Sequence, residues 1–325
     1  MILSYPFSEQ ILLAASALLV LILPGLLWVI FKNDGRDPVE RLADVVGLSI
    51  SSLAIAGMLF FFLGWRFSGG LITAIFVSLA LVALYFLVKQ RGHIQRGHFL
   101  WLLVTGLVLL LVIAFRFYQA RDLVFPAWVD SVHHVFITQK IIDYGGLPQT
   151  LAPELDVPLF YHYGFHLIAA LFSWISRLEP AQAVLWFGQV INALVVLGIY
   201  RLSKALWRKT LPALLAALLV GFAFQMPAYY LTWGRYTLLT GLLVMLPAMA
   251  VAFELVMDGF SRERAARLVV LTAGLALVHY LALFYFGLFL LSLVIERGVA
   301  WYRHPEGEDR KQIFKSLWPM GLAAT

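Results

Sequence analysis

Long apolar runs recur along this chain, and they constrain its fold more than any other feature. Ten of them occupy residues 9–31, 42–63, 70–88, 99–115, 164–178, 181–200, 211–226, 236–257, 267–279 and 281–295, and another begins near 313. A helix needs about 20 apolar residues to cross the hydrocarbon core of a bilayer. The runs do not alternate apolar with polar residues, which argues against a β-barrel. The sequence therefore predicts an all-α, polytopic transmembrane bundle with about nine to eleven membrane helices.

The composition supports a membrane protein. Of 325 residues, 62% are hydrophobic and only 13% are charged, whereas soluble domains carry about 25% charged residues. The net charge of +6 comes from loop lysines and arginines, which set orientation and face anionic membrane lipids. We therefore expect membrane lipids as partners and no nucleic acid. Because cysteine is absent, disulfides and thiolate metal sites are excluded.

Basic loops predict the orientation, because lysine and arginine favour the cytoplasmic side. These loops are 32–41, 89–98, 201–210 and 258–267, followed by segment 296–312. All can be cytoplasmic together only if 160–200 crosses once, with 164–178 re-entrant or interfacial. If 164–178 spans instead, loop 201–210 faces outward. We favour the single crossing, in the plasma membrane of a bacterium or archaeon.

We divide the chain into an N-terminal three-helix membrane segment, 1–98, and a transmembrane core, 99–325. The core contains a long extracytoplasmic loop, 116–163, and its last apolar run is about half a span, so we expect a truncated C-terminus. Segment 267–279 is expected to be short, because 13 helical residues cover only about 20 Å. Pro24 and Gly25 are expected to bend the first span.

A polar, histidine-rich stretch begins at Asp130. Residues 129–143 predict an interfacial amphipathic helix, with an apolar stripe formed by Val129, Val132, Val135, Phe136 and Ile142. Asp130 precedes His133 and His134 by three and four residues, so all three are expected on one side. A carboxylate beside imidazoles serves as a general base, or joins them on a divalent metal such as Mg or Mn, with Asp130 and His134 as ligands. The alternative is a helix-capping aspartate followed by solvated histidines.

Two further motifs add candidate substrate-binding residues. In YHYGFH, His162 and His166 have the four-residue spacing that suits a ligand or metal site, although the motif is equally typical of an aromatic belt. In YYLTWGRYTLL, Arg235 beside Tyr236 could bind a lipid phosphate, or could extend to ordinary headgroups. His279 separates two apolar runs and is either part of the same cavity or a helix end.

In this order, the segments resemble the GT-C superfamily of membrane glycosyltransferases, which use polyprenyl-phosphate-linked sugars. After span 99–115, WVDSVHH is similar to the family's acidic motif on a membrane-parallel helix, YGGLPQ to its turn and PLFYHYGFH to its aromatic approach to the next helix. YYLTWGRYTLL is similar to a protein mannosyltransferase segment, and GLALVHY to a helix-ending histidine motif. The chain departs from the family in having three earlier spans and Asp130-Ser131 in place of an Asp-Glu pair.

The resemblance implies an integral membrane glycosyltransferase that moves a sugar from a polyprenyl-phosphate carrier to a glycan, lipid or protein acceptor on the extracytoplasmic face. Asp130 would then be the base, while His133, His134, His162, His166, Arg235, Tyr236 and His279 would bind substrate. The alternatives are a non-catalytic membrane scaffold subunit and a lipid or solute transporter. A transporter is disfavoured because the expected spans contain almost no charge. No P-loop, GxSxG or HExxH motif occurs.

Overall fold

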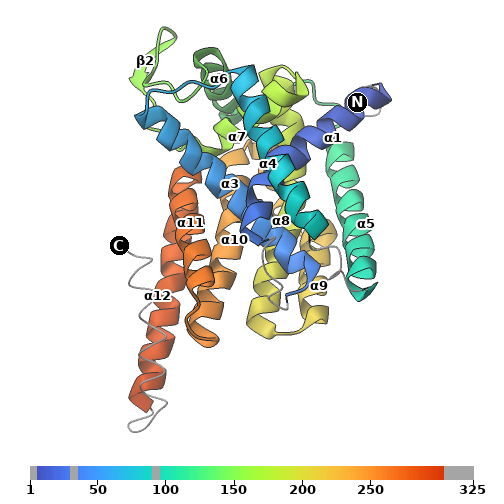
Figure 1. Ribbon diagram of the computed structural model, residues 1–325, viewed down its shortest axis with the longest axis vertical. Helices are drawn as coiled ribbons and strands as arrows, with labels where there is room; N and C mark the ends of the chain where they lie inside the picture. The colour runs from blue at the N-terminus through green and yellow to red at the C-terminus, as the bar shows by residue number, and fades with distance from the viewer. Residues whose placement is uncertain (1–5, 30–35, 90–95, 304–325) are drawn as a thin grey trace.

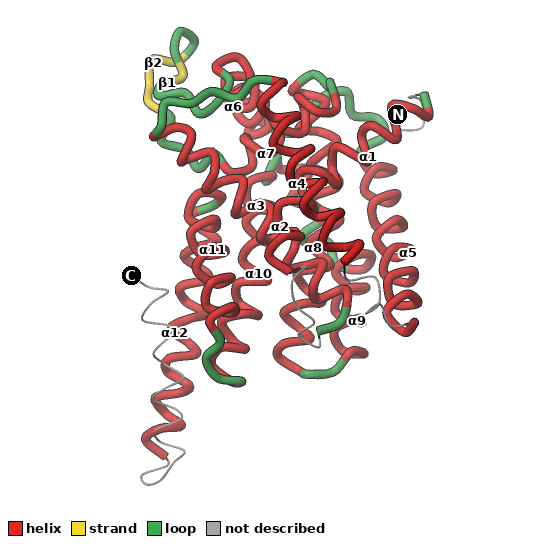
Figure 2. The backbone as a smooth tube through the Cα atoms, in the orientation of Figure 1, coloured by secondary structure: helices red, strands yellow, loops and turns green. Residues whose placement is uncertain are grey.

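The computed structural model describes residues 6–29, 36–89 and 96–303, which form a helix bundle with one small β-hairpin (Figures 1 and 2). The helices are α1 (Phe7–Leu21), α2 (Leu23–Val29), α3 (Pro38–Phe62), α4 (Gly69–Lys89), α5 (Arg96–Gln119), α6 (Val129–Tyr144), α7 (Gly164–Ser176), α8 (Pro180–Trp207), α9 (Thr210–Leu218), η3 (Leu219–Ala223), η4 (Ala228–Trp233), α10 (Tyr236–Met257), α11 (Arg262–Val278) and α12 (Tyr280–Arg303). Strands β1 (Thr150–Leu151) and β2 (Leu155–Pro158) pair antiparallel. The run expected near 313, much of loop 89–98 and the end of segment 296–312 lie outside the described residues.

The protein is an integral membrane protein. Within the described ranges, five helices are long and apolar enough to cross a membrane, namely α3, α4, α8, α10 and α12. The bent pair α1–α2 counts as a sixth if it forms one span, with a 43° angle between its two helices. The bend lies at Ile22, next to Pro24 and Gly25, so the predicted bend of the first span is confirmed. Fewer of the described helices qualify than the nine to eleven expected, because α7 and the α9–η3 pair are short.

The core of the bundle consists of α3, α8, α10 and α11, which pack against one another. The helix α3 begins at a capping box, in which the Asp37 side chain accepts from the backbone N–H of Glu40 and the Glu40 side chain accepts from that of Asp37. Pro38 occupies the first helical position, where its missing N–H costs nothing. The N-terminal segment thus contributes α3 to the same core as the later helices, and the division at residue 98 stays a prediction.

The two ends of the core differ in their polar residues. We name one the arginine end, where the start of α3, the ends of α8 and α10 and the start of α11 meet around Arg201 and Glu254. The other is the histidine end, where α6, the start of α7 and the start of α10 meet around His134 and His166. In Figure 1 the hairpin and α6 lie at the upper, histidine end, and α12 extends beyond the other helices at the lower end.

Only α8 connects the two ends between residues 160 and 207. Its Asn192 donates to the Pro227 carbonyl on the histidine side, and its Arg208 pairs with Asp258 at the arginine end. The helix α7 is 13 residues long and stays at the histidine end. The described parts of the basic loops around 36–41, 201–210 and 258–267 therefore lie together, as the single-crossing interpretation predicts. The face of the membrane on which they lie remains an expectation.

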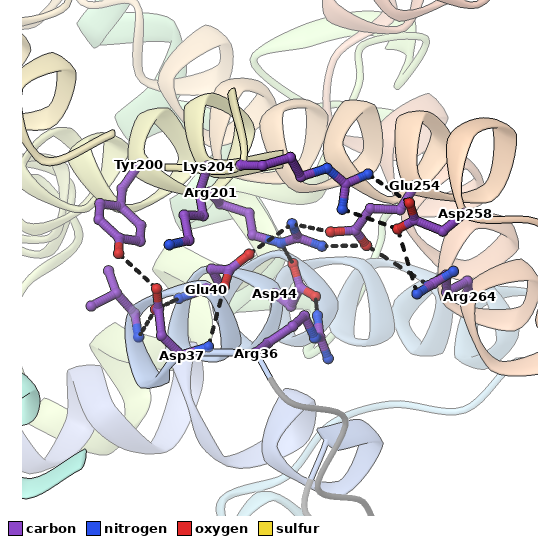
Figure 3. Close-up of polar contacts among 12 residues, drawn as sticks. Arg36, Asp37, Glu40, Asp44, Tyr200, Arg201, Lys204, Glu254, Asp258 and Arg264 are labelled. Carbon is purple, nitrogen blue, oxygen red and sulfur yellow. Dashed lines mark hydrogen bonds and ion pairs between the residues drawn. The ribbon is translucent and has the colours of Figure 1, made fainter. Parts of the chain in front are cut away.

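The arginine end contains a buried network of charges, shown in Figure 3. The Arg201 guanidinium is fully buried and donates from Nε to Asp44 at 2.9 Å and from Nη1 and Nη2 to Glu254 at 2.6 and 2.9 Å. It also reaches Glu40 at 3.3 Å. Arg36 pairs with Asp44 as well. Three helices, α3, α8 and α10, are thus joined by ion pairs that water does not reach freely, and α11 joins them through Arg267, 3.9 Å from Asp44.

This network corrects the expectation that charges lie in the loops and that the spans are almost free of them. Arg201 was expected in a loop, but α8 continues to Trp207 and places it inside the protein. Asp44 and Glu254 are buried within α3 and α10. The sequence interpretation failed because a membrane helix can contain a charge when neighbouring helices supply its partner.

Three other expectations need correction. The helix α6 packs against the bundle with a mixed face, on which Ser131, His134 and Ile141 are buried, while the proposed apolar stripe is partly exposed at Val129 and Val132. The helix expected over the apolar residues 267–279 begins earlier, at Arg262, and is 17 residues long. Its additional first turn contains charged residues, which the apolar run did not include. The loop expected at 116–163 begins after Gln119, where α5 ends.

Candidate functional site

The histidine end brings together most of the residues selected from the sequence. Asp130 and His134 come from α6. His166 comes from the first turn of α7 and His162 from just before it, Tyr236 from the first turn of α10 and Arg235 from just before it, and His279 from the break between α11 and α12. These side chains span about 150 residues of sequence (279 − 130 = 149). They form one polar group, separate from the charge network at the arginine end.

A close backbone approach makes this convergence possible. Gly234 has a left-handed φ of 63°, and a Cβ there would lie 2.6 Å from the Ser131 hydroxyl and 3.0 Å from its backbone nitrogen. Only glycine fits such a contact without displacing the first turn of α6. Trp128, which precedes α6, also has a positive φ of 76°, a strained conformation for a bulky residue. The start of α6 is therefore held against the turn that precedes α10.

Asp130 and Arg235 form an ion pair across this contact. Arg235 Nη1 lies 3.3 Å from Asp130 Oδ2, and the side chains are 52% and 37% exposed, respectively. Exposed pairs of this kind add only about 0–1 kcal/mol to stability. Both groups remain accessible to a ligand, which a buried structural pair would not be.

Beneath the ion pair lies a group of buried imidazoles. His134 Nδ1 and His166 Nε2 are 2.9 Å apart and form a hydrogen bond, in which one ring donates and the other accepts. The rings of His162 and His279 are 4.6 Å apart between centroids. Tyr236 packs edge-on against His134, with centroids 5.9 Å apart. The histidine end thus has an exposed charged rim over a buried aromatic floor.

Burial keeps these imidazoles neutral. It lowers the pKa of His134 to about 4, and the nearby Asp130 carboxylate offsets only part of that change. Burial and the neighbouring His279 lower the pKa of His162 to about 3. Burial, assisted by Arg235, lowers the pKa of His279 to about 4. At neutral pH the floor therefore offers hydrogen-bond donors and acceptors, but no positive charge.

Several buried nitrogens have no partner among the described residues. They are both ring nitrogens of His162 and Nδ1 of His166. Buried polar groups are almost always hydrogen-bonded to protein or to ordered water. These nitrogens therefore mark the place where water or polar ligand atoms would bind.

His133 does not join this group. It is exposed, whereas His134 is buried, because successive helical residues point about 100° apart. The expectation that Asp130, His133 and His134 project to one side is therefore correct only for Asp130 and His134.

The two residues proposed as metal ligands, Asp130 and His134, each have another partner in the structure. His134 hydrogen-bonds both His166 and the backbone of Gly234, and Asp130 pairs with Arg235. Among the residues that the structure describes, no group of three or more histidine, aspartate or glutamate side chains is placed to hold a metal ion. Binding of Mg or Mn by Asp130 and His134 stays a prediction, and we derive no chemistry from it.

One comparison with known proteins identifies a family. Residues 18–324 match the model of a family of unknown function (DUF6541). The chain belongs to the DUF6541 family. No curated protein and no solved structure gives a significant match to this DUF6541 member. The matched range of this DUF6541 chain includes both the histidine end and the arginine end.

Sequence reasoning missed some polar residues of the site. The Tyr236 side chain hydrogen-bonds Ser131, which is fully buried. Tyr161 hydrogen-bonds Thr237, one residue after Tyr236. A signal was available, since Ser131 and Thr237 directly adjoin selected residues. Their burial in this DUF6541 fold depends on contacts between distant segments, which the sequence does not display.

Proposed function

We propose that the protein is a membrane glycosyltransferase that moves a sugar from a polyprenyl-phosphate carrier to an acceptor hydroxyl at the histidine end. The observation that carries the proposal is the accessible Asp130–Arg235 pair above buried neutral imidazoles. A carboxylate and a guanidinium, side by side, match the two charges that such a transfer must manage. The order of motifs that resembles GT-C enzymes adds to this support.

The reaction would proceed as a single displacement. The acceptor oxygen attacks the anomeric carbon and forms the new C–O bond, while the bond from that carbon to the phosphate oxygen breaks. Asp130 takes the acceptor proton, and polyprenyl phosphate leaves with the bonding electron pair. Arg235 neutralises the charge that develops on the phosphate. Attack opposite the leaving group inverts the anomeric configuration.

Neutral imidazoles suit the sugar itself. His162 and His166 have unpartnered buried nitrogens, which could accept or donate hydrogen bonds to sugar hydroxyls. Tyr161 and Tyr280 add aromatic rings beside His162, with the Tyr280 centroid at 5.1 Å. Orientation by such groups lowers the entropic part of the barrier. The acceptor, whether glycan, lipid or protein, would approach from the exposed side of Asp130, and we place this side extracytoplasmically.

Release of polyprenyl phosphate tests the proposal without knowledge of the acceptor. The full chain in liposomes would be given undecaprenyl-phosphate mannose, glucose or arabinose with a membrane extract as acceptor, and products would be followed by mass spectrometry. Asp130→Asn should lower the rate about 10²- to 10⁴-fold, as expected for loss of a general base. Arg235→Gln should lower it as well, with little change in stability.

The matched control is a second arginine–aspartate pair, whose carboxylate is more exposed than that of Asp130. Arg121 and Asp122 lie 3.4 Å apart shortly after α5 and are 51% and 83% exposed. Asp122→Asn should leave the rate unchanged. Equal rates for wild type and Asp130→Asn would refute the catalytic role and favour a scaffold subunit.

A transporter is the second candidate, because the arginine end places Asp44, Glu254 and Arg201 at the ends of membrane helices. Buried ionisable groups in such helices are typical of ion and substrate pathways. A transporter would lose flux on neutralisation of Asp44 and would yield no glycosylated product in the same liposomes.

A further inference from the structure

A cavity next to the histidine end contains a buried arginine. The cavity has a volume of about 420 Å³ and lies between the end of α5, η3 and η4. Its wall includes Phe115, Arg116, Gln119, Gln189, Phe224 and Tyr229. Tyr236 also lines it, so this one ring separates the cavity from His134.

Arg116 has only neutral partners. It is 1% exposed, and it donates to the Gly221 carbonyl at 2.9 Å and to Gln119 Oε1 at 3.1 Å. Its Nε is buried without a hydrogen bond. Across residues 6–29, 36–89 and 96–303, no carboxylate forms an ion pair with Arg116. Arg201, the other fully buried arginine, has three carboxylates around it.

A buried guanidinium without a counterion is unfavourable, because it loses water and gains no opposite charge. Arginine in a membrane helix usually relieves this cost by extending to the surface, yet Arg116 stays inside. A bound anion would supply the missing charge and could accept from the free Nε. The local backbone also departs from a regular helix, since Gly221 belongs to a π-helical turn, a feature common at functional sites.

We propose that this cavity binds a phosphate group, with Arg116 as its cationic partner. The guanidinium offers a planar set of donors that matches phosphate oxygens. Arg116 lies in the last turn of α5, near the end of the bundle, where the phosphates of membrane lipids are found. Phe115, Phe222 and Phe224 on the same wall suit the apolar part of a lipid. The site does not depend on the proposed sugar transfer.

Binding can be measured on the purified full chain in detergent. Dioleoyl phosphatidylglycerol is added in one series and inorganic phosphate or pyrophosphate in another, and the unfolding temperature is followed. The unfolding temperature of the wild type should rise with one of the two probes. A rise with the lipid identifies the ligand as a lipid phosphate, and a rise with the soluble anion identifies it as free phosphate or pyrophosphate. Arg116→Gln should raise the apparent Kd at least about tenfold, and it should not lower the stability of the ligand-free protein.

The stability of ligand-free Arg116→Gln separates ligand binding from a structural role. If Arg116 only supports the Gly221 carbonyl, Arg116→Gln lowers the unfolding temperature without ligand and leaves the ligand-induced shift intact, which overturns the proposal. Arg121→Gln, five residues further along and outside the cavity, should change neither measurement. Ala223→Trp narrows the cavity from an exposed position while Arg116 is kept, and it should also weaken binding. The absence of any shift with either probe would refute the site.

Discussion

Replacement of Arg201 by methionine tests whether the arginine-end network stabilises the fold. The change removes a guanidinium that contacts Asp44, Glu40 and Glu254 together. Methionine has a similar length and no charge, so steric effects are small. The carboxylates remain buried, and Glu254 loses two hydrogen bonds at once.

The expected cost follows from the geometry. Three of the Arg201 contacts are shorter than 3.0 Å. A hydrogen bond to a charged group contributes about 1.5 kcal/mol or more, so three give ~4–5 kcal/mol. Breaking a buried ion pair by removing one partner costs about 3–5 kcal/mol, which agrees. We therefore expect the free energy of unfolding to fall by about 4 kcal/mol.

Unfolding in mixed micelles, titrated with a denaturing detergent, measures this change. Arg208→Met is the matched control, because Arg208 makes a two-bond contact with Asp258 but is 49% exposed; it should cost about 0–1 kcal/mol. Glu254→Gln in the Arg201→Met background should recover part of the loss, because a neutral amide is cheaper to bury than a carboxylate whose remaining ion pair, with Arg264, is 4.0 Å long. If Arg201→Met costs no more than Arg208→Met, water reaches the network and the reasoning is wrong.

Three further predictions concern pH, packing and orientation. The pKa of His134 falls from 6.5 to about 4 on folding, so the unfolded state binds more protons than the folded state between these pH values. The contribution of His134 to stability should therefore decrease as pH falls from 6.5 towards 4, by on the order of 3 kcal/mol. His134→Gln should weaken this dependence in thermal unfolding, and exposed His133→Gln should not. Gly188→Ala should lower the free energy of unfolding, measured by denaturant titration, by about 1–3 kcal/mol. It should also disturb the site, because the added Cβ would overlap the ring of Tyr236. Unchanged stability would contradict this packing. Since the chain lacks cysteine, Lys209→Cys can be labelled alone in whole cells; a membrane-impermeant reagent should not reach it, and labelling would invert the proposed orientation.

Much of the fold could be predicted from the sequence. The apolar runs place most helices within a few residues of their observed bounds, because a membrane span needs a continuous apolar stretch. The distribution of basic loops also predicts that α7 stays at one end. The helix over 129–143 is confirmed, although its buried face is not the one expected. The hydrophobic pattern of a helix predicts its buried face poorly when that face includes polar side chains, as the buried face of α6 does.

The candidate site was predicted in its residues but not in its geometry. Sequence reasoning selected Asp130 and Arg235 separately, on two distant motifs of an expected outer face. Their pairing depends on the contact between Gly234 and Ser131, which joins segments about 100 residues apart (234 − 131 = 103). No local pattern reveals such a contact.

The sequence by itself determined that the chain is a membrane helix bundle, where most of its helices lie and which residues could carry chemistry. These properties are local, since they follow from runs of neighbouring side chains and from their hydropathy. Only the tertiary structure decided which charges are buried and which have partners: among the described residues, Arg201 pairs with three carboxylates and Arg116 with none. The physical reason is that the cost of burying a charge depends on what lies within a few ångströms of it in space, and that is set by helices far apart in sequence.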